Sequence, residues 1–191
     1  MDKPELEKML DYVDATREKR TLMANQILEN PDLIPTLLNI IEEDNDPLAC
    51  KASWVLEFVL KKDISMILPH LKKFTQIISK ISLDSSVRPM AKICELLSIE
   101  YFSKTSNQTQ KSLTVNHLTK ITEAAFDWVI GEYKVAAKAY SMTTLFLIGK
   151  KFRWIHPELK LVLTQNYNSG SAAYKARARK ILEQIKKLEQ S

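Results

Sequence analysis

The residue types that most often perform catalysis or bind metals are few and widely spaced in this sequence. The 191-residue chain holds three histidines (His70, His117 and His156) and two cysteines (Cys50 and Cys94). No histidine lies three or four residues from another or beside a cysteine, so the spacing of a zinc site is absent. The three glycines are far apart, so no glycine-rich phosphate loop is present either. We therefore expect no metal, no cofactor and no catalytic residue, and two buried free thiols.

Lysines and arginines, in contrast, recur beside four alanines, Ala52, Ala91, Ala139 and Ala178, which lie 39, 48 and 39 residues apart. A period near 40 residues is typical of helical repeat arrays. In such an array these cations would line one face and could follow a phosphate backbone. The alternative is that they are only the polar flanks of amphipathic helices. The candidate groove or anion-binding residues are Lys51, Trp54, Arg88, Lys92, Lys138, Lys175, Arg177 and Arg179.

The charge of the chain is unevenly distributed. The net charge is +5, but the residues through Lys104 include 14 basic and 17 acidic side chains, whereas those beyond it include 14 basic and 6 acidic ones. This asymmetry favours an anionic partner for the C-terminal half. The acidic N-terminus has no apolar signal segment, and no apolar run is long enough to span a bilayer. We expect a cytoplasmic protein without a membrane segment.

Amphipathic segments separated by proline and polar clusters predict an all-α fold. The clearest of these segments, 64–81, has its apolar residues at steps of three and four and is expected to kink at Pro69. Segment 104–113 is polar and aperiodic, which predicts a surface loop. We expect one domain over 1–191 with about five helix pairs, in which 1–30 form N-terminal cap helices.

The segment Val87-Arg88-Pro89-Met90-Ala91 resembles the second helix of a HEAT repeat, and the segments around the other three alanines keep the alanine but not the arginine. The resemblance extends from about Pro31 onward. It implies a right-handed α-α superhelix, a HEAT-like solenoid, whose second helices line a shallow groove. HEAT arrays bind many kinds of partner. We expect a non-catalytic scaffold that binds a protein or peptide in this groove, with nucleic-acid binding through the basic C-terminal half as the alternative.

Two resemblances imply an enzyme instead. Several stretches are similar to a small bacterial HEAT-like family whose members are labelled adenylosuccinate lyase. That lyase has a flexible-loop motif, Ser-Ser-x-Met-Pro-x-Lys-x-Asn, which resembles the stretch that begins at Ser85. In this sequence Arg88, Ala91 and Ile93 replace the methionine, lysine and asparagine of the motif. HEAT-like DNA alkylation-repair glycosylases use an aromatic and acidic cleft, a role that would fall here to Trp54 with Glu57 or to Asp127 with Trp128. No motif of that family matches this sequence residue by residue.

Overall fold

A computed structural model describes residues 2–190, and every regular element among them is a helix. The described chain is 78% helical, which confirms the predicted all-α class. None of its helices is long and apolar enough to cross a bilayer. The eleven α-helices found in this part of the chain are α1 (Lys3–Asp11), α2 (Arg17–Glu29), α3 (Ile34–Glu42), α4 (Leu48–Lys62), α5 (Leu71–Ile78), α6 (Asp84–Tyr101), α7 (Gln108–Ser112), α8 (Val115–Ile130), α9 (Val135–Gly149), α10 (Ile155–Gln165) and α11 (Ala172–Glu189).

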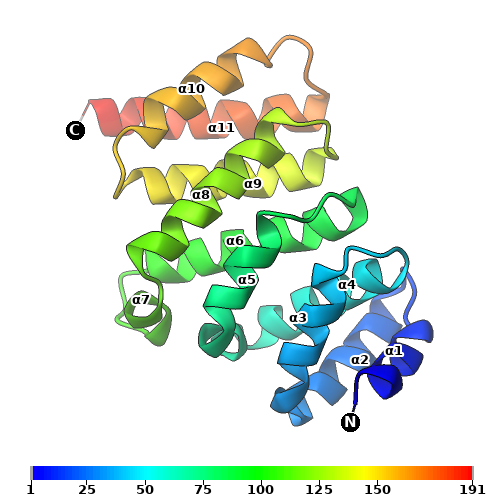
Figure 1. Ribbon diagram of the computed structural model, residues 1–191. Coiled ribbons are helices and arrows are strands. Elements are labelled where there is room, and N and C mark those ends of the chain that lie inside the picture. The colour runs from blue at the N-terminus through cyan, green and yellow to red at the C-terminus, as the bar shows by residue number, and fades with distance from the viewer. Residues whose placement is uncertain (1, 191) are drawn as a thin grey trace.

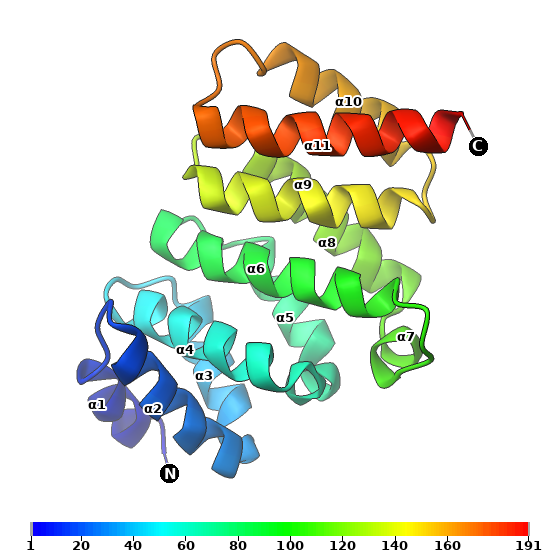
Figure 2. The same cartoon turned by 180° about the vertical axis from the view of Figure 1, so that it is seen from behind.

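The helices are arranged in two layers. Helices α2, α4, α6, α9 and α11 lie side by side in that order and form the first layer, in which each helix contacts the next (Figure 2). Helices α3, α5, α8 and α10 form the second layer, which crosses the first (Figure 1). Helix α1 packs at the N-terminal end against α3 and α4. One connected apolar core lies between the layers and extends from Leu6 in α1 to Ile185 in α11.

Helical periodicity explains which residues enter this core. In α5 the buried apolar residues Leu71, Phe74, Ile77 and Ile78 fall at steps of three, three and one, which places them on one face of the helix. The central helix α6 contacts α4 on one side and α9 on the other, so both of its flanks are covered. Ala91 is fully buried in this helix, where a small side chain allows close packing.

Hydrogen bonds between connections tie successive parts of the chain together. The carboxylate of Asp44, after α3, accepts from the backbone N–H and the hydroxyl of Ser82, before α6, both at 2.8 Å. Asp44 has a φ of 50°, in the left-handed region that Asp tolerates better than most residues. The carboxylate of Asp84 accepts from the backbone N–H of Lys134, before α9, at 2.9 Å. These contacts join residues 38 and 50 positions apart.

Two predicted segments differ in the structure. Segment 64–81 is not one kinked helix: Ile64–His70 form a 3-10 helix and α5 follows it. The reason is Pro69, which has no N–H to donate and whose ring clashes with the preceding turn of an α-helix. Segment 104–113, expected to be a surface loop, contains α7. Asn107 and Gln110 form a capping box there, and such reciprocal hydrogen bonds can start a helix without any apolar periodicity.

The alanine register holds in three of the four helices. Ala52, Ala91 and Ala178 are fully buried, but Ala139 in α9 is only half-buried and Val135 is exposed. The fully buried alanine of α9 is Ala137. Helix α9 contacts α6, α8, α10 and α11, so neighbours on several sides decide which of its residues are covered. The alanine spacing that predicts the buried alanine in the other three helices therefore misplaces it by two positions in α9.

Candidate functional site

A cleft of about 310 Å³ opens on the first layer where α2, α4 and α6 meet the start of α9. Five of its lining side chains are cations and two are carboxylates, which leaves a formal charge of +3. We call it the basic cleft. Its lining residues are Arg17, Arg20, Trp54, Glu57, Phe58, Lys61, Asp84, Ser85, Arg88 and Lys134.

The helical period places the α4 residues of this cleft on one face. Trp54, Phe58 and Lys61 lie at i, i+4 and i+7, and Glu57 lies beside them on the flank that packs against α6. Arg17 and Arg20 are separated by one turn of α2 and approach from the neighbouring helix. The guanidinium of Arg20 lies 4.0 Å from the Trp54 ring centroid, a cation–π distance. Two helices that are distant in sequence thus supply one aromatic and cationic surface.

A buried carboxylate orients the arginine of α6. The side chain of Glu57 is 1% exposed, and its Oε2 accepts from Arg88 Nη2 at 2.6 Å. Its Oε1 accepts from Lys61 Nζ at 2.5 Å and lies 3.5 Å from Arg88 Nη1. A carboxylate removed from water requires such partners, because desolvation strongly disfavours an unpaired charge. Glu57 therefore holds Arg88 in place and is itself occupied.

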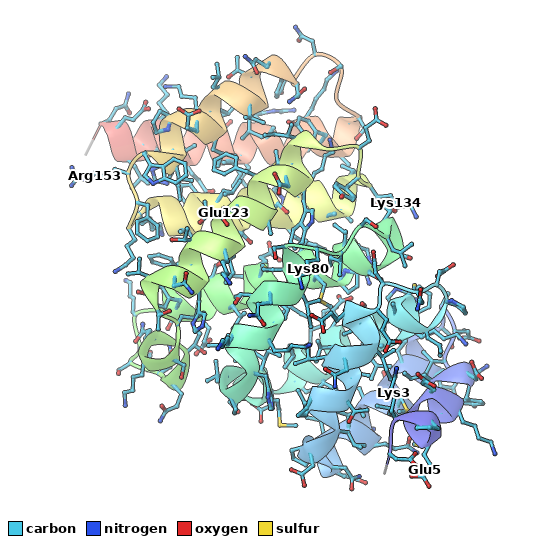
Figure 3. The ribbon with its side chains drawn as sticks, viewed as in Figure 1. Lys3, Glu5, Lys80, Glu123, Lys134 and Arg153 are labelled. Atoms are coloured by element: carbon cyan, nitrogen blue, oxygen red, sulfur yellow. The ribbon has the colours of Figure 1, made fainter. Side chains whose placement is uncertain are left out.

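Arg20 contacts the backbone as well as the Trp54 ring. Its Nε donates to the backbone carbonyl of Asp14 at 3.1 Å. Partial burial and the positive charge of Arg88 lower the pKa of the Arg20 guanidinium from its usual value. The second carboxylate, Asp84, already accepts from Lys134 through its backbone N–H and pairs with its Nζ at 3.0 Å. Figure 3 shows Lys134 at the edge of the molecule where α9 begins.

This arrangement can bind anions, but it offers no acid–base pair. Neither histidine nor cysteine is among the described residues that line the cleft, and Ser85 carries their only hydroxyl group. Glu57 is shielded from solvent and bound by two cations, so it cannot reach a substrate while these contacts persist. No group of three or more metal-ligating side chains exists in residues 2–190.

Of the eight predicted site residues, the structure brings only Trp54 and Arg88 into this cleft. Lys51 donates to the carbonyl of Asp11 at 3.0 Å and stabilises the end of α1, where carbonyl groups lack partners. Arg179 is exposed and lines a separate hollow between α10 and α11. Lys138 and Lys175 are half-buried on α9 and α11. Burial lowers the pKa of the Lys138 ammonium.

The other two predicted cations bridge neighbouring helices of the first layer. Lys92 on α6 pairs with Glu95 at 2.6 Å and lies 4.8 Å from the ring centroid of Tyr140 on α9. Arg177 on α11 donates to the Thr143 hydroxyl on α9 at 3.0 Å. A row of cations along the layer therefore exists in part, and three of its members, Lys51, Lys92 and Arg177, are already engaged within the protein.

Sequence reasoning missed Arg17, Arg20, Lys61 and Lys134. The signal available for Lys61 was its position four residues after Glu57, a spacing that forms ion pairs on helices. Arg17 and Arg20 share a helix face, but the sequence does not show that this face meets Trp54. Lys134 lies before α9 and belongs to no periodic pattern. These residues become a site only through the packing of four helices.

The remaining two tryptophans lie outside the basic cleft. Trp128 is buried in the core and cannot serve with Asp127 as a binding wall. Trp154, which is 57% exposed, stacks on Phe126 with ring centroids 6.0 Å apart. This pair lines a cleft of about 700 Å³ on the second layer with the acidic residues Glu123 and Asp127. Figure 3 shows Glu123 on α8, in the layer that faces the viewer.

The chain matches no protein-family model, and comparisons with curated proteins and with solved structures also found no match.

Proposed function

We propose that this protein is a non-catalytic HEAT-like scaffold that binds a partner protein or peptide on the open face of its first layer. The observation that carries this proposal is the basic cleft between the packed helices α2, α4 and α6. It combines a net positive charge with the exposed parts of Trp54 and Phe58 on α4. Aromatic and arginine side chains on a rigid surface are the residues that most often dominate binding energy in protein interfaces.

The solenoid architecture belongs to this proposal. The order α2, α4, α6, α9, α11 in one layer, with α3, α5, α8 and α10 in the other, fits about five successive helix pairs when α1 is counted with α2. The hydrogen bonds from Ser82 to Asp44 and from Lys134 to Asp84 span 38 and 50 residues, close to the alanine spacings in the sequence. Such repeated contacts between neighbours are typical of right-handed α-α superhelices. In that architecture the first layer would line the groove.

Binding of a nucleic acid is the alternative, and the positions of the cations disfavour it. A polynucleotide needs a succession of cations that can replace its counterions. On the first layer outside the cleft, Lys51, Lys92 and Arg177 already contact Asp11, Glu95 and Thr143. The basic cleft gathers a formal charge of +3, and four of its five cations come from the acidic first half of the sequence.

Fluorescence anisotropy can decide between these two partner classes. The probes are a labelled pool of degenerate acidic peptides, single-stranded DNA and double-stranded DNA, each titrated at several salt concentrations. We expect the peptide pool to bind and the double variant Arg17→Gln/Arg20→Gln to lose this binding. Arg179→Gln is the matched control, because Arg179 is exposed on a different surface. DNA binding with a steep salt dependence, lost in the double variant, would replace the scaffold proposal with the nucleic-acid one.

A further inference from the structure

Two of the five cations in the basic cleft lack an acidic partner. The carboxylates of Glu57 and Asp84 are taken by Arg88, Lys61 and Lys134. The guanidinium of Arg17 makes no hydrogen bond or ion pair with any residue in 2–190, and that of Arg20 bonds only to a backbone carbonyl there. Like charges that share a cleft repel one another, and an anion placed between them removes this cost.

Two of the three cleft arginines, Arg20 and Arg88, are held in position before any ligand arrives. Arg20 is fixed between the Trp54 ring, 4.0 Å away, and the carbonyl of Asp14. Arg88 is fixed by two contacts with Glu57, whose side chain is buried. A planar guanidinium presents its N–H groups in a fork that matches the oxygens of phosphate and carboxylate groups. Preorganised forks lose little conformational entropy on binding, which favours affinity.

The size and charge of the cleft select among anions. One carboxylate carries a single negative charge, whereas a phosphate monoester carries about −1.5 to −2 at neutral pH and three acceptor oxygens. The dianion is the better match to a formal charge of +3 and to three arginines. The volume of about 310 Å³ accommodates one such group and a short side chain. A polynucleotide would extend beyond it, along a layer on which Lys51, Lys92 and Arg177 are already engaged.

We propose that the basic cleft binds a phosphate monoester on a partner peptide through Arg17, Arg20 and Arg88, an inference that rests on the scaffold function proposed above. Arg88 and Arg20 grip the phosphate oxygens from α6 and α2, and Arg17 closes the outer side. Trp54 and Phe58 provide the wall against which the peptide chain beside the phosphorylated side chain packs. The phosphate is the determinant of affinity, and the surrounding peptide adds contacts along the open face of the first layer.

The test uses three degenerate peptide pools that are identical except at the central residue, which is phosphoserine, glutamate or serine. Binding to the full chain is measured by fluorescence anisotropy at near-physiological salt. We expect the phosphoserine pool to bind at least ten times more tightly than the glutamate pool. Millimolar inorganic phosphate should displace it, and acetate at equal ionic strength should not. Arg20→Gln and Arg17→Gln should each weaken binding of the phosphoserine pool about tenfold or more, and Arg179→Gln should leave it unchanged.

Each other outcome refutes a defined part of the reasoning. If the phosphoserine and glutamate pools bind with equal affinity and both arginine variants lose this binding, the phosphate inference is overturned and the scaffold proposal stands. Phosphoserine binding that survives both variants would overturn the assignment to this cleft. Binding of single-stranded DNA but of no peptide pool would overturn both proposals, and so would the absence of any binding. Arg17 is exposed and makes no side-chain bond within residues 2–190, so Arg17→Gln tests the site without disturbing the fold.

Discussion

Replacing Arg88 with methionine tests whether the buried carboxylate of the cleft depends on its partner. Arg88→Met keeps the apolar stem of the side chain and removes the guanidinium that donates to Glu57 at 2.6 Å. Glu57 then retains only Lys61. Because the Glu57 side chain is 1% exposed, water reaches its carboxylate only through the space that the guanidinium leaves toward the cleft, and it replaces the lost hydrogen bonds only in part. The variant should therefore lower the free energy of unfolding without creating a cavity.

The magnitude follows from the burial of the two partners. Removing one partner from a fully buried ion pair costs about 3–5 kcal/mol. Here Lys61 remains on the second oxygen and the Arg88 side chain is 26% exposed, so we expect a smaller loss of about 2 kcal/mol. For a chain of this length, about 2–4 °C of melting temperature corresponds to each kcal/mol. The melting temperature should fall by about 4–8 °C.

Urea denaturation followed by circular dichroism measures this loss directly. The variants Glu57→Gln, Arg88→Met and Glu57→Gln/Arg88→Met form a double-mutant cycle. The double variant should be at least about 1 kcal/mol more stable than the sum of the losses in the two single variants predicts. Lys134→Met is the matched control. It breaks the exposed pair with Asp84 and should cost less than about 1 kcal/mol. The reasoning is refuted if Arg88→Met unfolds within about 0.5 kcal/mol of the original protein, or if the two single losses simply add.

Further measurements test the core and the surface. Ala91→Leu should lower stability by about 1–3 kcal/mol in urea denaturation, because it overpacks a fully buried contact of α6; an unchanged midpoint would contradict the close packing. Burial raises the pKa of both Cys50 and Cys94, so a thiol reagent at pH 8 should label the native protein slowly, and Cys94 more slowly than Cys50. In denaturant both thiols should react rapidly. Rapid labelling of the native protein would show that the thiols are accessible. Hydrogen bonds from the hydroxyl and the backbone N–H of Thr16 hold the pKa of the Asp14 carboxyl below its usual 3.8. The ionised carboxylate therefore stabilises the folded protein above pH 4, and this contribution fades as the pH falls through the folded pKa. The melting temperature of Asp14→Asn should accordingly be below that of the original protein, and the difference should be largest at neutral pH. A difference that grows on acidification would show that the pKa of Asp14 is raised in the folded protein and not lowered.

The amino-acid sequence determines the helices and most of their buried faces. A repeat of three and four residues fixes which side of its own helix a residue occupies, and this was enough to place Ala52, Ala91 and Ala178 in the core. A first-turn proline or a side-chain cap marks the starts of α1, α3, α7, α8 and α11. Where the sequence interpretation was wrong, another local rule prevailed, as with the 3-10 helix at Pro69 and the capping box at Asn107.

Only the tertiary structure decides the site. Arg20 reaches Trp54 from another helix, and Arg88 meets Glu57 from a position 31 residues away. Which face of one helix meets which face of the next depends on the lengths of the connections and on packing across two layers, and no periodicity within one helix contains that information. The same packing engaged Lys92 and Arg177 with other residues, and it left Arg17 and Arg20 in one cleft with no acidic partner among the described residues 2–190. Charge counted along the chain shows the excess of the C-terminal half, but it does not show the basic cleft, where four of five cations come from the first half of the sequence.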